Sequence, residues 1–290
     1  MKYDVIIPMA FNELMFIDKA LPYIEQNLIG VDTIYLITNK KYFKKLSKLI
    51  CKHQRCVVLD ENELVPEMTF LNVSTSLNNK YGKGIRTGWY FQQFIKMGFA
   101  HSSYCKDYYL SWDADTIPLR PIFFFDKDNR PIFTMKSEYN KPYFDTMERL
   151  LGLGKIAEGS FIAEHMMFKK NIMKEIITEI EKRNSRPWYD AIIFSTDYAS
   201  AGRPEMFSEF ETYGTYCLNK YPNVYVSRTL SSFREAGFIR GRFLVKRILQ
   251  RMSFDLDTAS FELQHCPAFP WSVIHKFYKL YLKYVKYLYI

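Results

Sequence analysis

The chain has 290 residues, of which 48% are hydrophobic and 24% charged, and this balance excludes a disordered protein. Its length allows one large domain or two small ones. The formal net charge is +9, and residues 234–290 carry +6 of it, with ten Lys or Arg against four acids. Five scattered cysteines without a C-x-x-C pair argue against a disulfide framework, so we expect reduced thiols in the cytoplasm.

The first half of the chain alternates strands with helices. Short apolar runs predict strands at residues 5–8, 33–38, 56–59 and 108–112. Apolar residues at helical spacing predict helices at residues 13–27, 42–52 and 89–99. This alternation is typical of an α/β fold with a doubly wound, mostly parallel sheet flanked by helices.

The second half of the chain is less regular. Strands are expected at residues 131–135, 160–163 and 224–227, and helices at residues 170–182 and 208–220. The sequence has no internal repeat and no linker rich in Pro, Gly and Ser. The simplest organisation is one domain over residues 1–232, followed by a basic, aromatic and helical region over residues 233–290.

Two aspartates directly follow the strand expected at residues 108–112. Asp113 and Asp115 are spaced i and i+2, so in extended backbone their side chains share one side. Open α/β sheets bind ligands beyond the carboxyl ends of their strands, and two carboxylates there suit a divalent ion whose shell a diphosphate completes. Such an ion neutralises charge on a leaving nucleoside diphosphate. The alternative is a strand end with two solvated aspartates.

Several segments together resemble GT-A glycosyltransferases and, more narrowly, an uncharacterised bacterial family associated with capsule and lipopolysaccharide assembly. They are D-E-N-E-L (60–64), R-T-G-W-Y-F-Q-Q-F-I-K (86–96), W-D-A-D-T-I-P-L (112–119), E-H-M-M-F (164–168) and S-E-F-E-T-Y-G (208–214). The resemblance implies a GT-A fold, a nucleotide-sugar donor (a UDP-sugar in first place), and Mn²⁺ or Mg²⁺ as cofactor. It also implies a donor half over about residues 1–120, an acceptor half over about residues 121–232, and a glycan or lipid-linked glycan acceptor.

The loop before the helix at residues 89–99 is a candidate donor-binding segment. Its bases and glycines lie next to a helix N-terminus, which suits an anion, and we expect Lys83 and Arg86 to contact the donor diphosphate or sugar. A flexible solvated loop is the alternative. Trp89 and Gln92 share a face of the helix and are expected near the sugar, although Trp89 equally fits a core position. The donor contacts expected at the end of the first strand are Pro8 and Asn12.

A carboxylate near the start of the helix at residues 208–220 is the expected general base. An inverting transferase needs such a group to take the proton of the acceptor hydroxyl. Ser208 and Glu211 fit the capping box S-x-x-E, which gives Glu211 a structural role and leaves Glu209 freer for catalysis. Asp197 is the other candidate. These assignments apply only to an inverting enzyme, because retention needs no dedicated base.

Two histidines are candidates for contacts in the same site. His165 follows the strand expected at residues 160–163 and is expected near the acceptor. His265 lies far downstream, where some GT-A enzymes place a third metal ligand beside the paired aspartates. A lone histidine is more often an ordinary packed or surface residue, and that alternative applies to both.

Residues 271–290 predict an amphipathic helix. Lys276, Lys279, Lys283 and Lys286 fall on one side of it, and aromatic and apolar residues lie opposite. A basic stripe beside such a face is typical of a helix in a membrane interface, so we expect peripheral attachment to the anionic inner face of the cytoplasmic membrane. The alternative is a helix that packs on the catalytic domain and exposes its lysines.

Two functions of other classes fit parts of the sequence. The order D-x-D-x-T after an apolar strand also matches haloacid-dehalogenase phosphotransferases, in which Asp113 would be the nucleophile. That family usually carries the motif on its first strand, whereas three strands are expected before it here. A nucleic-acid-binding protein would present a broad basic face with a recognisable motif. Because the basic residues gather at the C-terminal end instead, we expect no nucleic-acid partner.

Overall fold

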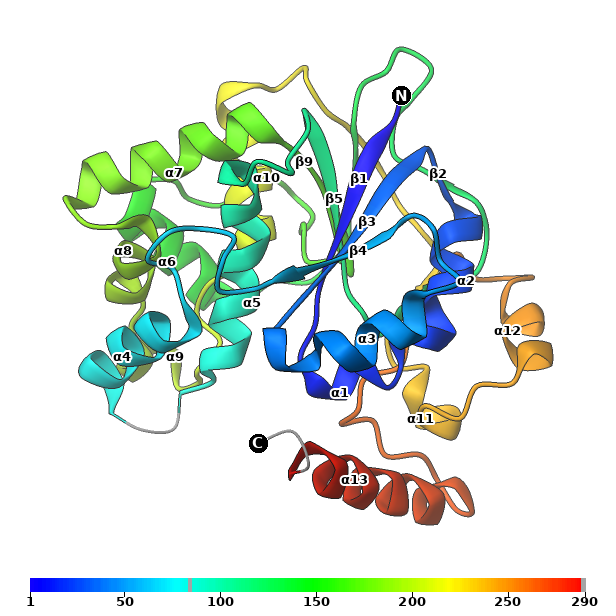
Figure 1. Ribbon diagram of the computed structural model, residues 1–290. Helices are drawn as coiled ribbons and strands as arrows, with labels where there is room; N and C mark the ends of the chain where they lie inside the picture. Colours follow the sequence, from blue (N-terminus) through cyan, green and yellow to red (C-terminus); the bar gives the residue numbers. More distant parts are fainter. Residues whose placement is uncertain (83–84, 288–290) are drawn as a thin grey trace.

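The computed structural model describes residues 1–82 and 85–287 (Figure 1). Its central five-stranded sheet has the order β4-β3-β1-β5-β9, and β9 runs antiparallel to β5 while the other pairs are parallel. The strands are β1 (Tyr3–Pro8), β3 (Val31–Thr38), β4 (Cys56–Asp60), β5 (Tyr108–Trp112) and β9 (His165–Lys169). The predicted α/β fold with a mostly parallel sheet is confirmed.

The central strands are buried on both faces of the sheet. In β1, Tyr3, Val5 and Ile7 belong to the core on one face, while Ile6 belongs to the core on the other. A strand that is covered on both sides is apolar at nearly every position rather than at alternate ones. This continuous apolar character is the reason why β1, β3 and β5 can be recognised in the sequence.

Helices cover both faces of the sheet (Figure 1). One face packs against α1 (Phe11–Leu14), α2 (Ile17–Asn27) and α3 (Phe43–Ile50). The core on the opposite face includes residues of α4 (Phe70–Tyr81), α5 (Thr87–Gly98), α6 (Lys141–Leu151), α7 (Lys170–Asn184), α8 (Trp188–Ser195) and α10 (Glu209–Lys220). Within residues 1–82 and 85–287, no helix is both long and apolar enough to cross a membrane.

The C-terminal region joins the edge of the molecule through a small sheet of order β11-β12-β6. In it, β12 (Thr258–Ser260) pairs antiparallel with β6 (Thr116–Pro118) and parallel with β11 (Ser232–Phe233). Because β6 starts immediately after Asp115, this pairing brings the C-terminal region next to the paired aspartates. The last helix, α13 (Trp271–Tyr287), lies below the carboxyl ends of the central strands (Figure 1).

One expected strand lies elsewhere in the chain. The segment at residues 160–163 forms only an isolated antiparallel bridge, between Ser160 and Lys136. The next backbone N–H, of Phe161, donates to the side chain of Glu211 and not to a neighbouring strand, and the apolar run that follows forms β9. The helix α4 was not expected either. The remaining elements are β2 (Leu28–Ile29), β7 (Ile122–Phe123), β8 (Ile132–Thr134), β10 (Val226–Arg228), α9 (Tyr198–Ala201), α11 (Gly237–Arg240), α12 (Lys246–Met252) and the 3-10 helices η1 (Lys40–Tyr42) and η2 (Phe99–His101).

Candidate active site

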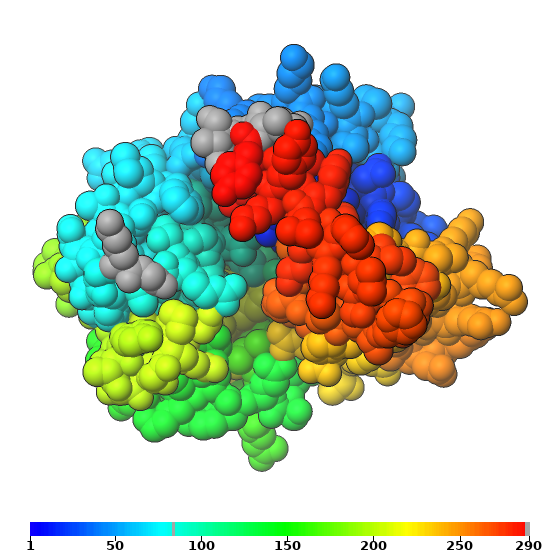
Figure 2. Space-filling model, turned by 90° about the horizontal axis from the view of Figure 1, so that it is seen from below, coloured from blue at the N-terminus to red at the C-terminus, as the bar shows by residue number. Residues whose placement is uncertain are grey.

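An open cavity of about 750 Å³ lies at the carboxyl ends of the parallel strands, with α13 along its mouth (Figure 2). Its lining includes Pro8 at the end of β1, Thr38 at the end of β3, Glu61 just after β4 and Asp113 just after β5. From β1 the chain adds β3 and β4 on one side and then returns to the other side of β1 to form β5. The cavity therefore lies where the strand order reverses, which is the usual ligand site of open α/β sheets.

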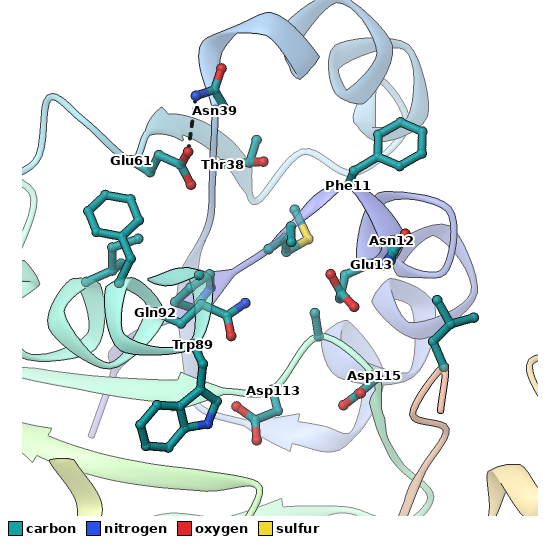
Figure 3. Close-up of a pocket in the computed structure, with 18 of the residues that line it drawn as sticks. Phe11, Asn12, Glu13, Thr38, Asn39, Glu61, Trp89, Gln92, Asp113 and Asp115 are labelled. Carbon is teal, nitrogen blue, oxygen red and sulfur yellow. Dashed lines mark hydrogen bonds between the residues drawn. The ribbon is translucent and has the colours of Figure 1, made fainter. Parts of the chain in front are cut away.

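Asp113 and Asp115 project into this cavity from the turn between β5 and β6 (Figure 3). Backbone hydrogen bonds fix the turn: Thr116 N donates to Asp113 O at 3.1 Å, and Phe261 N donates to Asp115 O at 2.9 Å. The buried indole of Trp112 adds a third bond, from Nε1 to Thr116 O at 2.9 Å. The backbone that carries the two carboxylates is thus held in place at the cavity.

The surroundings of Asp115 favour a cation. Burial and the nearby charge of Asp113 raise the pKa of Asp115 to about 7, against the opposing effect of Arg242. The Arg242 side chain is buried, and its Nη2 lies 3.8 Å from Asp115 Oδ2 and 3.5 Å from Glu13 Oε1. Burial raises the pKa of Glu13 as well. One guanidinium among these carboxylates leaves negative charge in excess, which a bound divalent cation would compensate.

The three expected metal ligands do not meet at one point. Among the described residues, no group of three His, Cys, Asp or Glu side chains is placed to hold a metal ion. The ring of His265 packs on Phe238, with centroids 4.6 Å apart, and His265 is not one of the described residues that line the cavity. Asp113 and Asp115 therefore offer two oxygen ligands, and a bound diphosphate would supply further ones.

A buried ammonium group lies directly behind Asp113. Lys96 Nζ, from α5, is 3.0 Å from Asp113 Oδ1 and 3.0 Å from Glu209 Oε1. With its side-chain amide turned so that the nitrogen faces the carboxylate, Gln93 donates to the same Glu209. Burial lowers the pKa of Lys96, but the charges of Asp113 and Glu209 outweigh it and raise the pKa above its usual value. Lys96 therefore remains charged and connects Glu209 to Asp113.

Glu209, the first candidate base, is 3% exposed and is not among the described residues that line the cavity. Burial raises the pKa of its carboxyl, and the neighbouring charge of Lys96 opposes this. Its carboxylate contacts Lys96, which does line the cavity, so Glu209 is linked to the cavity through this neighbour. A role as base stays a prediction, and the contacts themselves describe a residue that orients Lys96.

The two other candidate bases lie away from the cavity. Glu211 N donates to Ser208 Oγ at 3.2 Å, which is one half of the expected capping box, while its carboxylate accepts from Ser160 Oγ instead of returning to Ser208. Asp197 caps α9 and accepts from Ser200 N at 3.3 Å. Neither lines the cavity among the described residues, and their catalytic roles stay predictions.

His165 begins β9 and belongs to the buried interior. Its ring stacks on Trp112 with centroids 5.0 Å apart and an interplanar angle of 12°. Its Nε2 forms a hydrogen bond of 2.9 Å with Thr134 Oγ1. Burial lowers its pKa well below the usual range, so the imidazole is neutral. The expected acceptor contact stays a prediction, since His165 is not one of the described residues at the cavity wall.

The expected donor contacts gather around the cavity. Those that line it are Pro8, Asn12, Arg86, Trp89 and Gln92. Figure 3 shows Trp89 and Gln92 on the helix beside Asp113. Arg86 is exposed and pairs with Glu205, with Nη1 2.5 Å from Oε1, and Trp89 stacks on Tyr143 with centroids 6.5 Å apart. Lys83 lies outside the described residues.

The helix α13 presents three different sides. The side packed on the protein carries His275, Leu282 and Val285, which are buried. Two of its lysines, Lys279 and Lys286, line the cavity. The solvent side carries aromatic and apolar residues that are at least half exposed, namely Phe277, Leu280, Tyr281 and Tyr284. The helix therefore packs on the body, adds cations to the cavity and exposes an apolar surface.

Several residues in or beside the cavity were missed from the sequence. Arg242, Lys279 and Lys286 come from segments far from Asp113, and nothing in their local patterns ties them to it. Lys96 did carry a signal, because it is a lone cation within the buried run from Gln93 to Gly98. A charged residue in such a run must have a partner, and here the partners are carboxylates.

Comparison with protein families gives one match. Residues 21–229, more than half of the chain, match the model described as "Family of unknown function (DUF6492)". The chain belongs to this family. A comparison of this DUF6492 member with curated proteins finds no match.

Solved structures similar to this DUF6492 member include three glycosyltransferases. Mouse xyloside xylosyltransferase 1 is 10% identical with a TM-score of 0.48, covering 89% of this chain and 97% of that one. The galactosyltransferase LgtC, in complex with donor and acceptor sugar analogues, is 10% identical with a TM-score of 0.45, covering 89% and 86%. Core-mannan synthase A from Aspergillus fumigatus, in an Mn/GDP form, is 10% identical with a TM-score of 0.48, covering 78% and 72%.

These three solved structures are thus of the same class, glycosyltransferases, as the one that the sequence motifs of this chain resemble.

Proposed function

We propose that this chain is a metal-dependent glycosyltransferase, which takes a sugar from a nucleotide-sugar donor and passes it to a glycan acceptor. The supporting observation is the cavity that crosses the ends of four strands, with Asp113 and Asp115 at one end and polar groups and rings at the other. Its volume of about 750 Å³ accommodates a base, a diphosphate and a sugar together. A phosphoryl group on Asp113, as in a phosphotransferase, needs much less space.

The side chains around the diphosphate have complementary tasks in this proposal. Asp113 and Asp115 hold a Mn²⁺ or Mg²⁺ ion, which when bound would neutralise charge on the departing nucleoside diphosphate. Arg86, Lys279 and Lys286 line the cavity and attract the phosphates. Lys96, held by Glu209, keeps Asp113 in place from behind.

The acceptor is proposed to be a glycan or lipid-linked glycan of a bacterial surface polysaccharide, either capsule or lipopolysaccharide. The supporting feature is the exposed aromatic and apolar side of α13, which lies beside its lysines. Rings at headgroup depth and lysines near anionic phosphates would hold this helix on a membrane surface. The cavity mouth, along which α13 lies, would then open close to lipid-linked acceptors.

The membrane part of the proposal is tested with vesicles of neutral lipid containing a fraction of anionic phospholipid. We expect cosedimentation at low salt that weakens strongly as salt rises, because screening shortens the reach of the lysines. Equal binding to purely neutral vesicles, or no binding at low salt, would contradict it.

The enzymatic part is tested by thermal shift with UDP-, GDP-, CMP- and dTDP-sugars, with and without Mn²⁺. A donor that binds the folded chain at 100 times its Kd stabilises it by about 2.7 kcal/mol, so the true donor should raise the Tm only when metal is present. The variant Asp113→Asn should keep its fold and lose this response. A shift that persists in EDTA would contradict metal dependence.

A further inference from the structure

The end of the cavity opposite the aspartates is built around Glu61. This residue follows β4, and its backbone N–H donates to Thr38 O at 3.1 Å, so it extends the sheet. Asn39 Nδ2 donates to Glu61 Oε1 at 3.2 Å, which orients the carboxylate (Figure 3). Thr38 Oγ1 is buried without a hydrogen-bond partner among the described residues. Here the cavity wall offers a carboxylate whose orientation is fixed.

Aromatic rings flank this polar group from both sides of the sheet. Phe11 and Tyr42, on the side of α1, have centroids 5.4 Å apart, and Phe70 and Phe91, from α4 and α5, have centroids 5.6 Å apart. All four line the cavity. Phe70 is 42% exposed, and its ring is the surface on which a planar heterocycle can stack, whatever the identity of that heterocycle. Phe11, Tyr42 and Phe91 are buried and form the apolar wall behind it.

The turn that carries Glu61 is held rigidly. Asn62 N donates to Asp60 Oδ1 at 3.1 Å, and Phe70 N donates to Asn62 Oδ1 at 2.8 Å. The second bond joins the start of α4, with its ring, to the turn after β4. The carboxylate and a stacking surface are therefore placed relative to each other before any ligand binds.

The distance between the two ends of the cavity distinguishes a base from a ribose. Glu61 follows β4 and Asp113 follows β5, and β3 and β1 lie between these strands. Three strand spacings of about 4.8 Å separate them by about 14 Å. A ribose is joined directly to the diphosphate, so with the diphosphate at Asp113 the ribose would lie near β1. The outer edge of the base is the part of a nucleotide that extends as far as β4.

We propose that this end of the cavity binds the base of the donor nucleotide and that Glu61 selects guanine. The inference rests on the proposed nucleotide-sugar activity and specifies its donor. An ionised carboxylate accepts hydrogen bonds and donates none. Guanine presents two adjacent donors, N1–H and the N2 amino group, which match the two carboxylate oxygens. Uracil presents one N–H between two carbonyl oxygens, so the second carboxylate oxygen would face another acceptor.

This assignment replaces the UDP-sugar expected from the sequence with a GDP-sugar. The difference comes from one side chain, since stacking rings accept any base. Burial favours the neutral carboxyl and, with Asp60, raises the pKa of Glu61 to about 7, while the hydrogen bond from Asn39 opposes this. A guanine edge satisfies the ionised form, because it brings two N–H groups to a carboxylate that has lost water.

The test is calorimetric binding of GDP, IDP and UDP to the full chain in the presence of Mn²⁺. We expect GDP to bind about 10- to 100-fold more tightly than UDP, the usual range for one bidentate contact. IDP lacks the N2 amino group and should bind about tenfold more weakly than GDP. This comparison uses the unaltered protein and does not depend on the folding of a variant.

The variant Glu61→Gln should reverse the preference. A glutamine amide offers one acceptor and one donor side by side, which matches uracil N3–H and its neighbouring carbonyl. GDP should therefore weaken and UDP should bind as well as before or better. The matched control is Glu63→Gln in the same turn, because Glu63 is exposed, pairs with Lys40 at 3.1 Å and is not a described lining residue.

Three results would overturn the inference. The first is equal affinity of the unaltered chain for GDP and UDP, and the second is equal affinity for GDP and IDP. The third is an equal loss of affinity for GDP and UDP in Glu61→Gln, which would indicate that Glu61 contacts the ribose. If GDP, IDP and UDP all fail to bind with Mn²⁺ while a CMP- or dTDP-sugar raises the Tm, the proposed function stands and the choice of guanine is wrong. If none of these nucleotides or nucleotide sugars binds with Mn²⁺, the proposed function falls and the assignment of the base falls with it. If UDP binds in the metal-dependent way while GDP does not, the proposed function stands and the choice of guanine is wrong.

Discussion

Asp113 and Asp115 are two residues apart, and the structure gives them different electrostatic surroundings. Asp113 is paired with Lys96, and its side chain is 39% exposed. Asp115 has the more distant Arg242 at 3.8 Å and a pKa raised to about 7. Because Asp115 binds a proton more readily than an ordinary aspartate, protons compete with a metal ion mainly at this residue.

A pH dependence of metal affinity follows from that difference. Asp115 is mostly ionised above about pH 7 and mostly protonated below it. We therefore expect the apparent affinity for Mn²⁺ alone to fall as the pH drops below 7, by up to about tenfold per pH unit, and to level off above. The measurement is Mn²⁺ titration followed by electron paramagnetic resonance. Asp115→Asn should bind weakly at every pH, and an unchanged pH profile in this variant would contradict the assignment.

Glu209 allows a sharper test of its role. A base that acts directly loses kcat by about 10²- to 10⁴-fold on conversion to glutamine, with donor and metal affinity unchanged. A residue that acts through Lys96 has another effect, because Lys96 in Glu209→Gln would pair with Asp113 alone and oppose the cation there. We expect Glu209→Gln to weaken Mn²⁺ binding by about tenfold as well as to slow transfer. A loss of kcat without a change in Mn²⁺ binding would establish the direct role instead.

At the scale of elements, α13 connects the cavity to its surroundings. Its four lysines are three or four residues apart in the sequence, but the fold places only some of them at the cavity. All four are exposed, but Lys279 and Lys286 line the cavity, whereas Lys276 and Lys283 are not among the described lining residues. Lys276 and Lys283 therefore provide a charge-matched control for substitutions of Lys279 and Lys286.

We expect the double variant Lys279→Gln with Lys286→Gln to weaken nucleoside diphosphate binding by up to about tenfold, through two partly exposed charge interactions. Lys276→Gln with Lys283→Gln should leave nucleotide binding unchanged. Both pairs should weaken binding to anionic vesicles to a similar extent, because that attraction depends on the total charge of the helix. Equal loss of nucleotide binding in the two double variants would show that the lysines act through the net charge of the helix and not through their places at the cavity.

Sequence patterns identify elements well where local chemistry decides the structure. The buried parallel strands and the two aspartates after β5 are visible because continuous apolar runs and a D-x-D turn are local signals. The strand expected at residues 160–163 was misplaced because Glu211, about 50 residues later, takes hydrogen bonds from that segment. Arg242 and the lysines of α13 could not be assigned to the site, because only the fold brings them there.

At the scale of the whole molecule, residues beyond 232 complete the acidic end of the cavity. Arg242 Nε donates to Phe261 O and Nη1 donates to Asn12 O, both at 2.8 Å, and its Nη2 lies near Asp115. The strand β12 pairs with β6 in addition. The boundary at residue 232 that the sequence suggested therefore separates two parts of the chain that contact each other through Arg242 and β12.

We expect residues 1–232 expressed alone to be much less stable than the full chain. Removing the partner of a buried ion pair costs about 3–5 kcal/mol, and loss of β12 and of the apolar side of α13 adds to this. Urea unfolding followed by circular dichroism measures the difference. A fragment with native-like stability and full metal-dependent nucleotide binding would contradict this view.

The position of Arg242 in the chain also affects how the protein is made. A nascent chain emerges from the ribosome N-terminal end first, and its early segments begin to fold while later ones are still being synthesised. The groups that contact Arg242 are therefore synthesised long before it, Asn12 by as many as 230 residues. The others are Glu13 and Asp115. The contacts around Asp115 are therefore complete only after nearly the entire chain has been translated.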